Sequence, residues 1–475
     1  MIFGQIFKGT LSNLTGIALG ILSNIWLFPL VFSLEELGVY RWVERMSSLL
    51  MVIALFGLHR TYVRFQSQFT GYLARLFLSN TLSIISILAM IFALIFSNYT
   101  NQFSYILNMK YFPEMDVLGL VIFGSILYNF GLSIAATKKK IAFPFLIKNV
   151  GVRMALIIGV VFVYLGIFSF LEWMYLLAAI HLVVGISVLY YGMYQKKTTL
   201  VKPKIREFLT RKEFLAFSSS GVVMGILTMS MSTLDSQIIV TKIGFEALGV
   251  YSLAYFIGNL VESVRRPVSV SLTPLIAECW NEENYDGIHK IYKETSKILT
   301  AIVMAAAIFI IPNLEFLYGL IPDSQRFEGS SSLVLLILLA RLIDYSFGVN
   351  SEILSNGPYY RFNVGVTFLF VVSMVILCFL FIPIYGLNGV AITGVISYLI
   401  FNIVRSIYIY LKIRIFPFTK LHIKILAYGL VILGYSVFLE PTEIFNLLLM
   451  NIVNAGLIGF LYFFHKDELV FTANG

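Results

Sequence analysis

Long apolar runs follow one another along the whole chain, and short polar segments separate them. Each run is close to the ~20 residues that an α-helix needs to cross the hydrocarbon core of a bilayer. Hydrocarbon offers no hydrogen-bond partners to an open backbone, so every run is predicted to be a helix. The predicted spans are residues 10–32, 42–59, 77–97, 116–136, 149–169, 173–194, 214–240, 248–276, 298–320, 331–351, 364–384, 387–410, 424–440 and 443–464. The pattern therefore predicts an all-α polytopic membrane protein with about fourteen transmembrane helices.

The first and the seventh runs lead into the same four residues. Leu37-Gly38-Val39-Tyr40 follows the first run, and Leu248-Gly249-Val250-Tyr251 follows the seventh. The offset of 211 residues (248 minus 37) also aligns Asn24 with Asp235. A tetrapeptide can recur by chance, but the surrounding hydropathy matches as well. A repeat of this length is typical of a transporter made of two similar halves.

Six spans fall in each half, which predicts four segments along the chain. An N-terminal six-helix lobe covers residues 1–194, and a basic cytoplasmic linker covers 195–213. A second six-helix lobe covers 214–412, and two additional helices with a short cytoplasmic tail cover 413–475. Because six is even, both lobes are expected to start on the same side of the membrane and to be related by a pseudo-two-fold axis along the membrane normal.

Composition and charge agree with a membrane protein. Hydrophobic residues make up 59% of the chain and charged residues only 12%, about half the charged share of a soluble domain. With the N-terminus placed in the cytoplasm, 24 of the 34 lysines and arginines fall in inside segments and four in outside segments. This asymmetry predicts that both termini are cytoplasmic. It also accounts for most of the net charge of +9, so no nucleic-acid partner is expected.

Signatures of enzymes are missing from the sequence. The loops carry no catalytic cluster, there is no phosphate-binding Gly-x-x-x-x-Gly-Lys-Ser/Thr loop, and the five histidines lack metal-ligand spacing. The chain is therefore predicted not to be an enzyme and to hold no metal and no cofactor. His181 lies within a span and has two interpretations, a histidine satisfied within its own helix or a proton relay.

Charged residues at membrane depth are the candidate functional groups. A charge at the bilayer centre costs at least ~2.5–3.5 kcal/mol, so it faces protein or water. Arg41 can pair with Glu44 three residues later, and Arg45 lies beside them. This group is either a local ion pair or part of a site. Asp235 has no basic neighbour in its own span, so its partner must be another helix, a cation or a proton.

The eighth span carries two adjacent arginines in its middle. Glu262 can neutralise only one of Arg265 and Arg266, and Pro267 is expected to kink the helix there. A surplus guanidinium suits an anion with phosphate groups, which it binds through a bidentate fork. Arg341 and Asp344 form another i,i+3 pair, which is either structural or in contact with ligand.

Two further arginines, Arg153 and Arg405, lie nearer the predicted cytoplasmic ends of their spans. They can snorkel, with the apolar stem in the bilayer and the guanidinium in water.

The order and spacing of several degenerate motifs resemble the polysaccharide transporter family, the O-antigen or Wzx-type flippases. This family belongs to the multidrug/oligosaccharidyl-lipid/polysaccharide (MOP) exporter superfamily. The motifs are the two Leu-Gly-Val-Tyr segments, Gly57-Leu58 with Arg64-Phe65, Asp235, and residues 382–391, Ile-Pro-Ile-Tyr-Gly-Leu-Asn-Gly-Val-Ala. The resemblance covers nearly all of residues 1–412. It implies a MOP/MATE-like arrangement of two lobes. The last two spans are absent from twelve-helix members, whereas the related lipid II flippases also have fourteen.

The resemblance implies a function. Such proteins are thought to move an undecaprenyl-diphosphate-linked oligosaccharide, such as an O-antigen, capsule or exopolysaccharide repeat unit, across the bacterial inner membrane by alternating access. Coupling to a proton or sodium gradient is implied by the superfamily. The expected partners are the polyprenyl-diphosphate-linked oligosaccharide, membrane lipids, and glycan polymerases and glycosyltransferases, and the chain is expected to be a monomer.

Within this interpretation the intramembrane charges take two roles. The cavity arginines for diphosphate and acidic sugar are Arg265, Arg266, Arg341 and Arg45. The residues for ion coupling or charge balance are Asp235, Glu262, Asp344, Glu44 and Asn24. Three alternatives stay open: a cation-coupled multidrug antiporter of the same superfamily, a membrane glycan polymerase or ligase, and a non-transporting scaffold.

Overall fold

The computed structural model describes residue 12, residues 15–438 and residues 450–459, apart from residues 139, 197, 198, 210 and 328. The regular secondary structure of these residues is helical, which confirms the predicted all-α fold. The chain divides into two compact units between Val250 and Tyr251. The first and last predicted spans are only partly covered, because residues 10–14 except Ser12, 443–449 and 460–464 lie outside the described part.

The first unit contains sixteen of these helical segments, several of them short. They are η1 (Leu22–Leu27), α2 (Phe28–Val31), α3 (Leu34–Leu55), α4 (Leu58–Phe65), η2 (Gln66–Gln68), α5 (Gly71–Asn98), α6 (Thr100–Ile106), η3 (Pro113–Val117), α7 (Leu118–Thr137), α8 (Ala142–Leu146), η4 (Ile147–Gly151), α9 (Val152–Tyr164), α10 (Phe170–Lys196), α11 (Ile205–Leu209), α12 (Lys212–Lys242) and α13 (Phe245–Gly258), which crosses the division. The segments η1 and η4 are π-helical.

The second unit continues with nine helical segments in the described part of the chain. They are α14 (Glu262–Asn281), α15 (Tyr285–Ile310), α16 (Leu314–Gly319), η5 (Ser324–Phe327), α17 (Ser331–Ser346), α18 (Asn350–Asn356), α19 (Tyr360–Tyr385), α20 (Leu387–Ile413) and α21 (Lys420–Phe438). A further short apolar helix covers Met450–Gly459.

Length and apolarity of the helices match a membrane protein. Within the described residues, eight helices are long and apolar enough to cross a bilayer, and two bent pairs would raise this number to ten. One pair is α3 with the segment Leu58–Gln68, bent by 52°, and the other is α17 with α18, bent by 48°. Glycines with positive φ stand at both bends, Gly57 (φ 63) and Gly348 (φ 58), where a side chain would strain the backbone.

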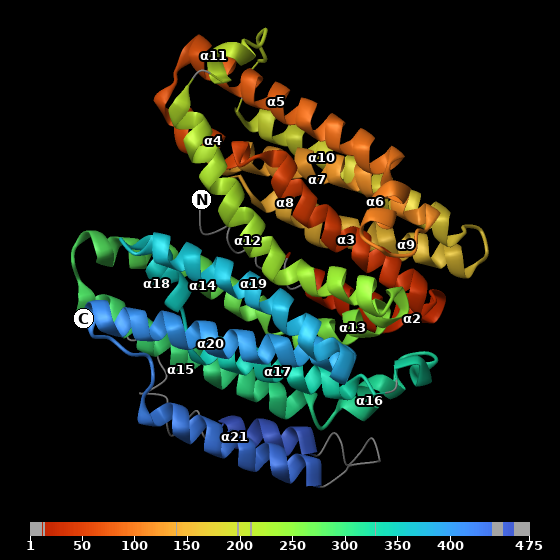
Figure 1. The fold of residues 1–475 in the computed structure, drawn as a ribbon, viewed down its shortest axis with the longest axis vertical. Helices are drawn as coiled ribbons and strands as arrows, with labels where there is room; N and C mark the ends of the chain where they lie inside the picture. Colours follow the sequence, from red (N-terminus) through yellow and green to blue (C-terminus); the bar gives the residue numbers. More distant parts are fainter. Residues whose placement is uncertain are drawn as a thin grey trace. The chain divides into compact units, whose positions relative to one another are not determined.

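In the first unit, α7 is the central helix and packs against α10, α5 and α3 (Figure 1). Its contact with α10 is close because glycines stand on both helices. A side-chain carbon added at Gly185 would lie 2.3 Å from the backbone oxygen of Gly124, and one added at Gly192 would lie 2.7 Å from that of Gly131. Small residues at such positions allow membrane helices to pack backbone to backbone.

The two Leu-Gly-Val-Tyr segments each pack their glycine against the other copy. A side-chain carbon at Gly38 would lie 2.0 Å from the backbone oxygen of Phe245, and one at Gly249 would lie 2.3 Å from that of Leu34. Phe245 follows Leu34 by the same 211 residues that separate Gly249 from Gly38. Such a reciprocal contact is what a two-fold relation between repeats requires. It explains why a glycine stands in both copies.

The helix α12 packs along α3 and belongs to the first unit. Sequence analysis assigns the same residues to the start of the second lobe, at 214–412. The predicted boundaries of the two lobes, the linker and the C-terminal pair stay predictions, because a division into compact units is a different property from the repeat.

In the second unit, α20 packs against both α19 and α17, and α15 packs against α17 and α21 (Figure 1). The predicted single helix over 248–276 is wrong, since it divides into α13 and α14 at residues 259–261. The helix α14 begins at Glu262 and runs on through Pro267. Arg265 therefore lies near the start of a helix and not in the middle of one, and Gly258-Asn259 is the weak helix-forming pair that precedes the break.

Candidate functional site

Arg41 and Glu44 form the ion pair that their spacing predicts, on the inner face of α3. The Nη1 atom of Arg41 lies 2.9 Å from Oε2 of Glu44. Its Nη2 atom donates a hydrogen bond to Oδ1 of Asn24, which stands in the π-helical segment η1. The amide of Asn24 donates in turn to the backbone oxygen of Gly20 at 2.7 Å. One carboxylate and one amide thus hold the guanidinium of Arg41 in place.

A cavity of about 160 Å³ lies beside this pair, within the first unit. Both π-helical segments contribute to its wall: Ser23 and Asn24 come from η1, and Lys148 and Asn149 come from η4. A π-helical turn inside an α-helix is rare and is frequent at functional sites. Arg41, Glu44, Arg153 and His181 complete the polar part of the lining.

Lys148 and His181 contact each other across this cavity. The ammonium of Lys148 lies 3.4 Å from Nε2 of His181, and Nδ1 of His181 lies 2.9 Å from the backbone oxygen of Leu177. A carbonyl only accepts, so Nδ1 carries the proton and Nε2 of the neutral ring accepts from Lys148. His181 is satisfied within its own helix, as one of the two interpretations has it, and it also orients a lysine.

Arg153 is the least satisfied cation of the cavity. Its Nη1 atom is buried and has no hydrogen-bond partner among the described residues. It lies where a side-chain carbon at Gly20 would stand, at 2.2 Å from that position. Only a glycine at position 20 leaves this room for the guanidinium. This end of the guanidinium is buried, whereas the residue as a whole is partly exposed, so the predicted snorkelling of Arg153 stays a prediction.

Asp235 receives its partner from α3. Its Oδ1 atom lies 3.0 Å from Nη1 of Arg45, which also donates to the hydroxyl of Ser236. Asp235 is 3% exposed, so the pair is shielded from water. The indole of Trp42 donates to Oε1 of Gln237 at 2.8 Å beside it. Of the three partners left open for Asp235, another helix, a cation or a proton, the structure shows the first.

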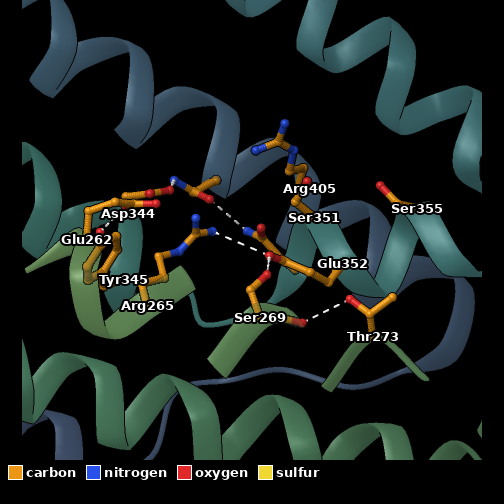
Figure 2. Close-up of polar contacts among 12 residues, drawn as sticks. Glu262, Arg265, Ser269, Thr273, Asp344, Tyr345, Ser351, Glu352, Ser355 and Arg405 are labelled. Atoms are coloured by element: carbon orange, nitrogen blue, oxygen red, sulfur yellow. Dashed lines mark hydrogen bonds and ion pairs between the residues drawn. The ribbon is translucent and has the colours of Figure 1, made fainter. Parts of the chain in front are cut away.

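In the second unit a network of charges joins α14, α17 and α18. Figure 2 shows the guanidinium of Arg265 directed at Glu352, with an Nη2–Oε1 distance of 3.8 Å. Ser269 donates to the same oxygen of Glu352. Glu262, the predicted partner of the arginines, accepts a hydrogen bond from the hydroxyl of Tyr345. The side chain of Arg266 lies outside the described residues, so its predicted role stays a prediction.

The predicted i,i+3 pair of Arg341 and Asp344 has different partners in the structure. Arg341 donates to the hydroxyls of Tyr398, at 3.0 Å, and Tyr255, at 3.3 Å. Asp344 accepts from the amide of Asn402 at 3.0 Å. The two charges on α17 are therefore satisfied by neutral groups on neighbouring helices, which sequence spacing within one helix does not reveal.

Arg405 is buried, with 5% of its surface exposed, and so does not snorkel as predicted. Its Nε atom donates to Oδ1 of Asn363 at 2.9 Å, and its Nη2 atom donates to the hydroxyl of Thr367 at 3.1 Å. Asp344 and Glu352 both lie close enough to interact with it electrostatically. It belongs to the same network through these electrostatic interactions, and not through a direct hydrogen bond to Asp344 or Glu352.

Two sets of charges can now be defined. The N-terminal cluster consists of Arg41, Glu44, Arg45, Lys148, Arg153 and Asp235, with four cations and two carboxylates. The C-terminal network consists of Glu262, Arg265, Arg341, Asp344, Glu352 and Arg405, with three cations and three carboxylates. The first set has a surplus of positive charge and the second is balanced. Over the described part of the chain, no group of three or more His, Cys, Asp or Glu residues is placed to hold a metal ion.

Comparisons with known proteins agree with this architecture. Residues 222–380 match the family model described as MatE, and no curated protein sequence matches the chain. The solved structure of the lipid II flippase MurJ, in an inward closed conformation, is similar with a TM-score of 0.78 and 16% identity. That similarity covers 97% of this chain and 99% of MurJ.

Other transporters share the fold over most of their length. A multidrug resistance MATE family transporter of the MOP superfamily, in an inward-facing conformation, has a TM-score of 0.67 and 17% identity over 85% of this chain and 98% of its own. A MOP superfamily transporter from Pyrococcus furiosus, described as having a binding pocket of reverse polarity, has a TM-score of 0.59 and 17% identity over 86% and 95%. The chain therefore has the fold of MOP superfamily transporters, as the predicted MOP/MATE-like arrangement requires.

Proposed function

We propose that this chain is a flippase that moves a polyprenyl-diphosphate-linked oligosaccharide across a membrane by alternating access. The surplus of positive charge in the N-terminal cluster is the observation that carries the proposal. Charges removed from water need a counter-charge, and a diphosphate supplies two or more negative charges at one end of the lipid. Similarity to MurJ, whose name states that it flips lipid II, supports a lipid-linked substrate.

Arginine is suited to this substrate for geometric reasons. Its guanidinium stays protonated and presents parallel N–H groups that match two phosphate oxygens. We assign the diphosphate and the acidic sugars to Arg45, Arg265, Arg266 and Arg341. Arg341 supports this role best, because neutral tyrosine hydroxyls hold it and no carboxylate does so directly.

The remaining assignments follow from the same proposal. Asp235, Glu262, Asp344, Glu44 and Asn24 would balance charge or couple transport to a proton or sodium gradient. The substrate places the chain in the inner membrane of a bacterium, with both termini in the cytoplasm, beside glycosyltransferases and a polymerase that make and extend the glycan. No cofactor and no covalent step are required, and a monomer suffices.

A second candidate is a cation-coupled multidrug antiporter. The match to the MatE family model and the similarity to a multidrug transporter favour it, as do the three carboxylates of the C-terminal network. A cationic drug, however, requires a site with surplus negative charge. Within the two sets of charges defined above, the carboxylates never outnumber the cations.

Reconstituted protein distinguishes the two functions. Purified full-length chain is placed in liposomes with a fluorescent undecaprenyl-diphosphate-linked disaccharide, and the fraction of label accessible to a membrane-impermeant quencher is followed over time. The flippase is expected to make inner-leaflet label accessible faster than protein-free liposomes do. Arg341→Ala should abolish the effect, and Arg341→Lys should rescue it poorly because an ammonium lacks the fork. No acceleration, together with gradient-driven uptake of a cationic dye, would overturn the flippase and establish the antiporter.

A further inference from the structure

We propose that the cavity enclosed by η1, α3, η4, α9 and α10 is a binding site for an oxyanion of the phosphate class. This site lies within the first unit and is distinct from the residues assigned above to the transported diphosphate. The proposal draws on the same surplus of positive charge as the proposed function, but it can be tested apart from transport, because the anion can be free phosphate or the phosphate of a lipid headgroup.

The charges that line the cavity do not cancel. Arg41, Lys148 and Arg153 contribute three positive charges, and Glu44 contributes one negative charge that is already paired with Arg41. Neither Lys148 nor Arg153 has an ion pair with a carboxylate of the described residues. Two partly buried cations that have no carboxylate partner of their own favour the binding of an anion beside them.

The side chains of Lys148, Asn149 and Arg153 line the same cavity. Nη1 of Arg153 has no partner among the residues described, and it occupies the room left by the missing side chain of Gly20. The ammonium of Lys148 is held through one of its three protons by the neutral ring of His181, which leaves the other protons for a ligand. Asn149 adds an amide to the same wall.

The size and the backbone of the cavity agree with a ligand site. A volume of about 160 Å³ corresponds to roughly five water molecules at ~30 Å³ each, which is enough for a tetrahedral oxyanion with some of its water. Two separate π-helical segments turn polar side chains into this one space. Such turns cost helical hydrogen-bond geometry and are retained mostly at functional sites.

The charges that line the cavity also disfavour a cationic ligand. Among the described residues that line it, Glu44 is the single carboxylate, and its Oε2 atom accepts from Arg41 at 2.9 Å. A metal ion or an organic cation would meet three positive charges and one negative charge. The chemistry of the lining therefore selects for an anion.

Binding of inorganic phosphate tests the proposal. Full-length protein is purified in a phosphate-free maltoside detergent, with gluconate in place of chloride, and the unfolding midpoint and calorimetric heat are measured as phosphate is added. We expect saturable binding at one site and a rise in the midpoint. Arg153→Gln and Lys148→Gln should each weaken binding about tenfold or more, since each removes a charged hydrogen bond. Arg75→Gln, which changes an arginine outside the cavity, should leave the affinity unchanged.

A second variant guards against misfolding of the charge variants. Gly20→Ala keeps every charge but places a carbon on the guanidinium of Arg153, so it should weaken phosphate binding while the protein elutes as a single species. A short polyprenyl diphosphate is titrated in parallel. Competition with phosphate, or binding of this lipid alone with the same dependence on Arg153 and Lys148, identifies a lipid headgroup as the source. If neither ligand binds, or if the Gln variants bind as tightly as the parent, the site does not exist, whatever the outcome of the flipping assay.

Discussion

The two units of this protein differ in how far carboxylates compensate their buried cations. In the C-terminal network, three carboxylates surround three arginines, and Asp344, Glu352 and Glu262 all interact electrostatically with Arg265. Amides and hydroxyls complete the network; Asn402, for example, donates to Asp344 and accepts from Asn350. In the N-terminal cluster, two carboxylates face four cations. The charges of the C-terminal network balance one another, although Nε of Arg265, Nε of Arg341 and Oε2 of Glu352 have no hydrogen-bond partner among the described residues. The N-terminal cluster has a surplus of positive charge and needs an anion from outside it.

This difference indicates where the ligand binds. A network of balanced charges fixes the geometry of a fold but has little affinity left for another charge. A cluster with surplus charge is stable only with a partner, so binding and folding are coupled there. The sequence predicts nearly the reverse, because it assigns the surplus of positive charge to Arg265 and Arg266, in the second unit.

The largest expected effect comes from a change that increases the surplus of positive charge in the N-terminal cluster. Asp235→Asn removes the carboxylate that lies 3.0 Å from Arg45, so the negative charge nearest to this guanidinium is lost. Breaking a buried pair on one side costs about 3–5 kcal/mol, which should lower the midpoint of thermal unfolding in detergent. The double variant Arg45→Ala/Asp235→Asn should regain much of this loss. A single variant as stable as the parent would mean that Arg45 has another anion, and the contrast between the units would fail.

A smaller effect is expected in the balanced unit. Glu352→Gln removes the ion pair with Arg265, which is long at 3.8 Å, but leaves Asp344 and Glu262 near the same guanidinium. We expect a loss of about 1–3 kcal/mol, the range for removing one partner of a buried hydrogen bond. The measurement is the same unfolding midpoint. A loss equal to that of Asp235→Asn would show that the network depends on one pair and not on shared charge.

The reciprocal glycine contact separates packing from charge. Gly38→Ala and Gly249→Ala each place a carbon against a backbone oxygen, so α3 and α13 must shift apart. Overpacking of this kind typically costs about 1–3 kcal/mol, and the two variants should lose similar amounts because the contacts are equivalent. Gly394→Ala in α20 is the control, since open space surrounds that position. Unequal losses would argue against a two-fold relation between the repeats.

Much of the fold could be predicted from the sequence. Apolar runs of sufficient length mark membrane helices because the bilayer imposes one length and one type of backbone. The Arg41–Glu44 pair could also be predicted, because both partners stand on one helix at i and i+3. The sequence likewise indicated that Asp235 needs a partner from outside its own span, and it left another helix, a cation and a proton open.

The rest of the site depends on contacts between helices, which one sequence does not encode visibly. Glu352 lies 87 residues from Arg265 (352 minus 265), and nothing in its surroundings marks it as a partner. From the sequence, Lys148 is predicted to lie in a cytoplasmic segment. In the structure it stands in the π-helical segment η4 and lines the cavity. The pair Gly258-Asn259 indicates the break before Glu262. The kink was instead expected at Pro267, further along the chain, because proline removes a helix hydrogen bond.

The smallest expected effect concerns the two hydroxyls that hold Arg341. Tyr398→Phe removes an acceptor at 3.0 Å and Tyr255→Phe removes one at 3.3 Å, so each should cost about 0.5–1.5 kcal/mol and the first more than the second. If Arg341 only completes the balanced network, transport should fall no further than the amount of folded protein. If it contacts the diphosphate, either variant frees the guanidinium to move, and the rate per folded molecule should fall although the midpoint barely changes. The flipping rate and the unfolding midpoint are measured on the same samples. This separates the two outcomes, because a displaced ligand-binding guanidinium lowers the rate per folded molecule, whereas a structural one does not. If both variants have the same rate per molecule as the parent, Arg341 does not contact the anion, and the N-terminal cluster is the set of charges that binds it.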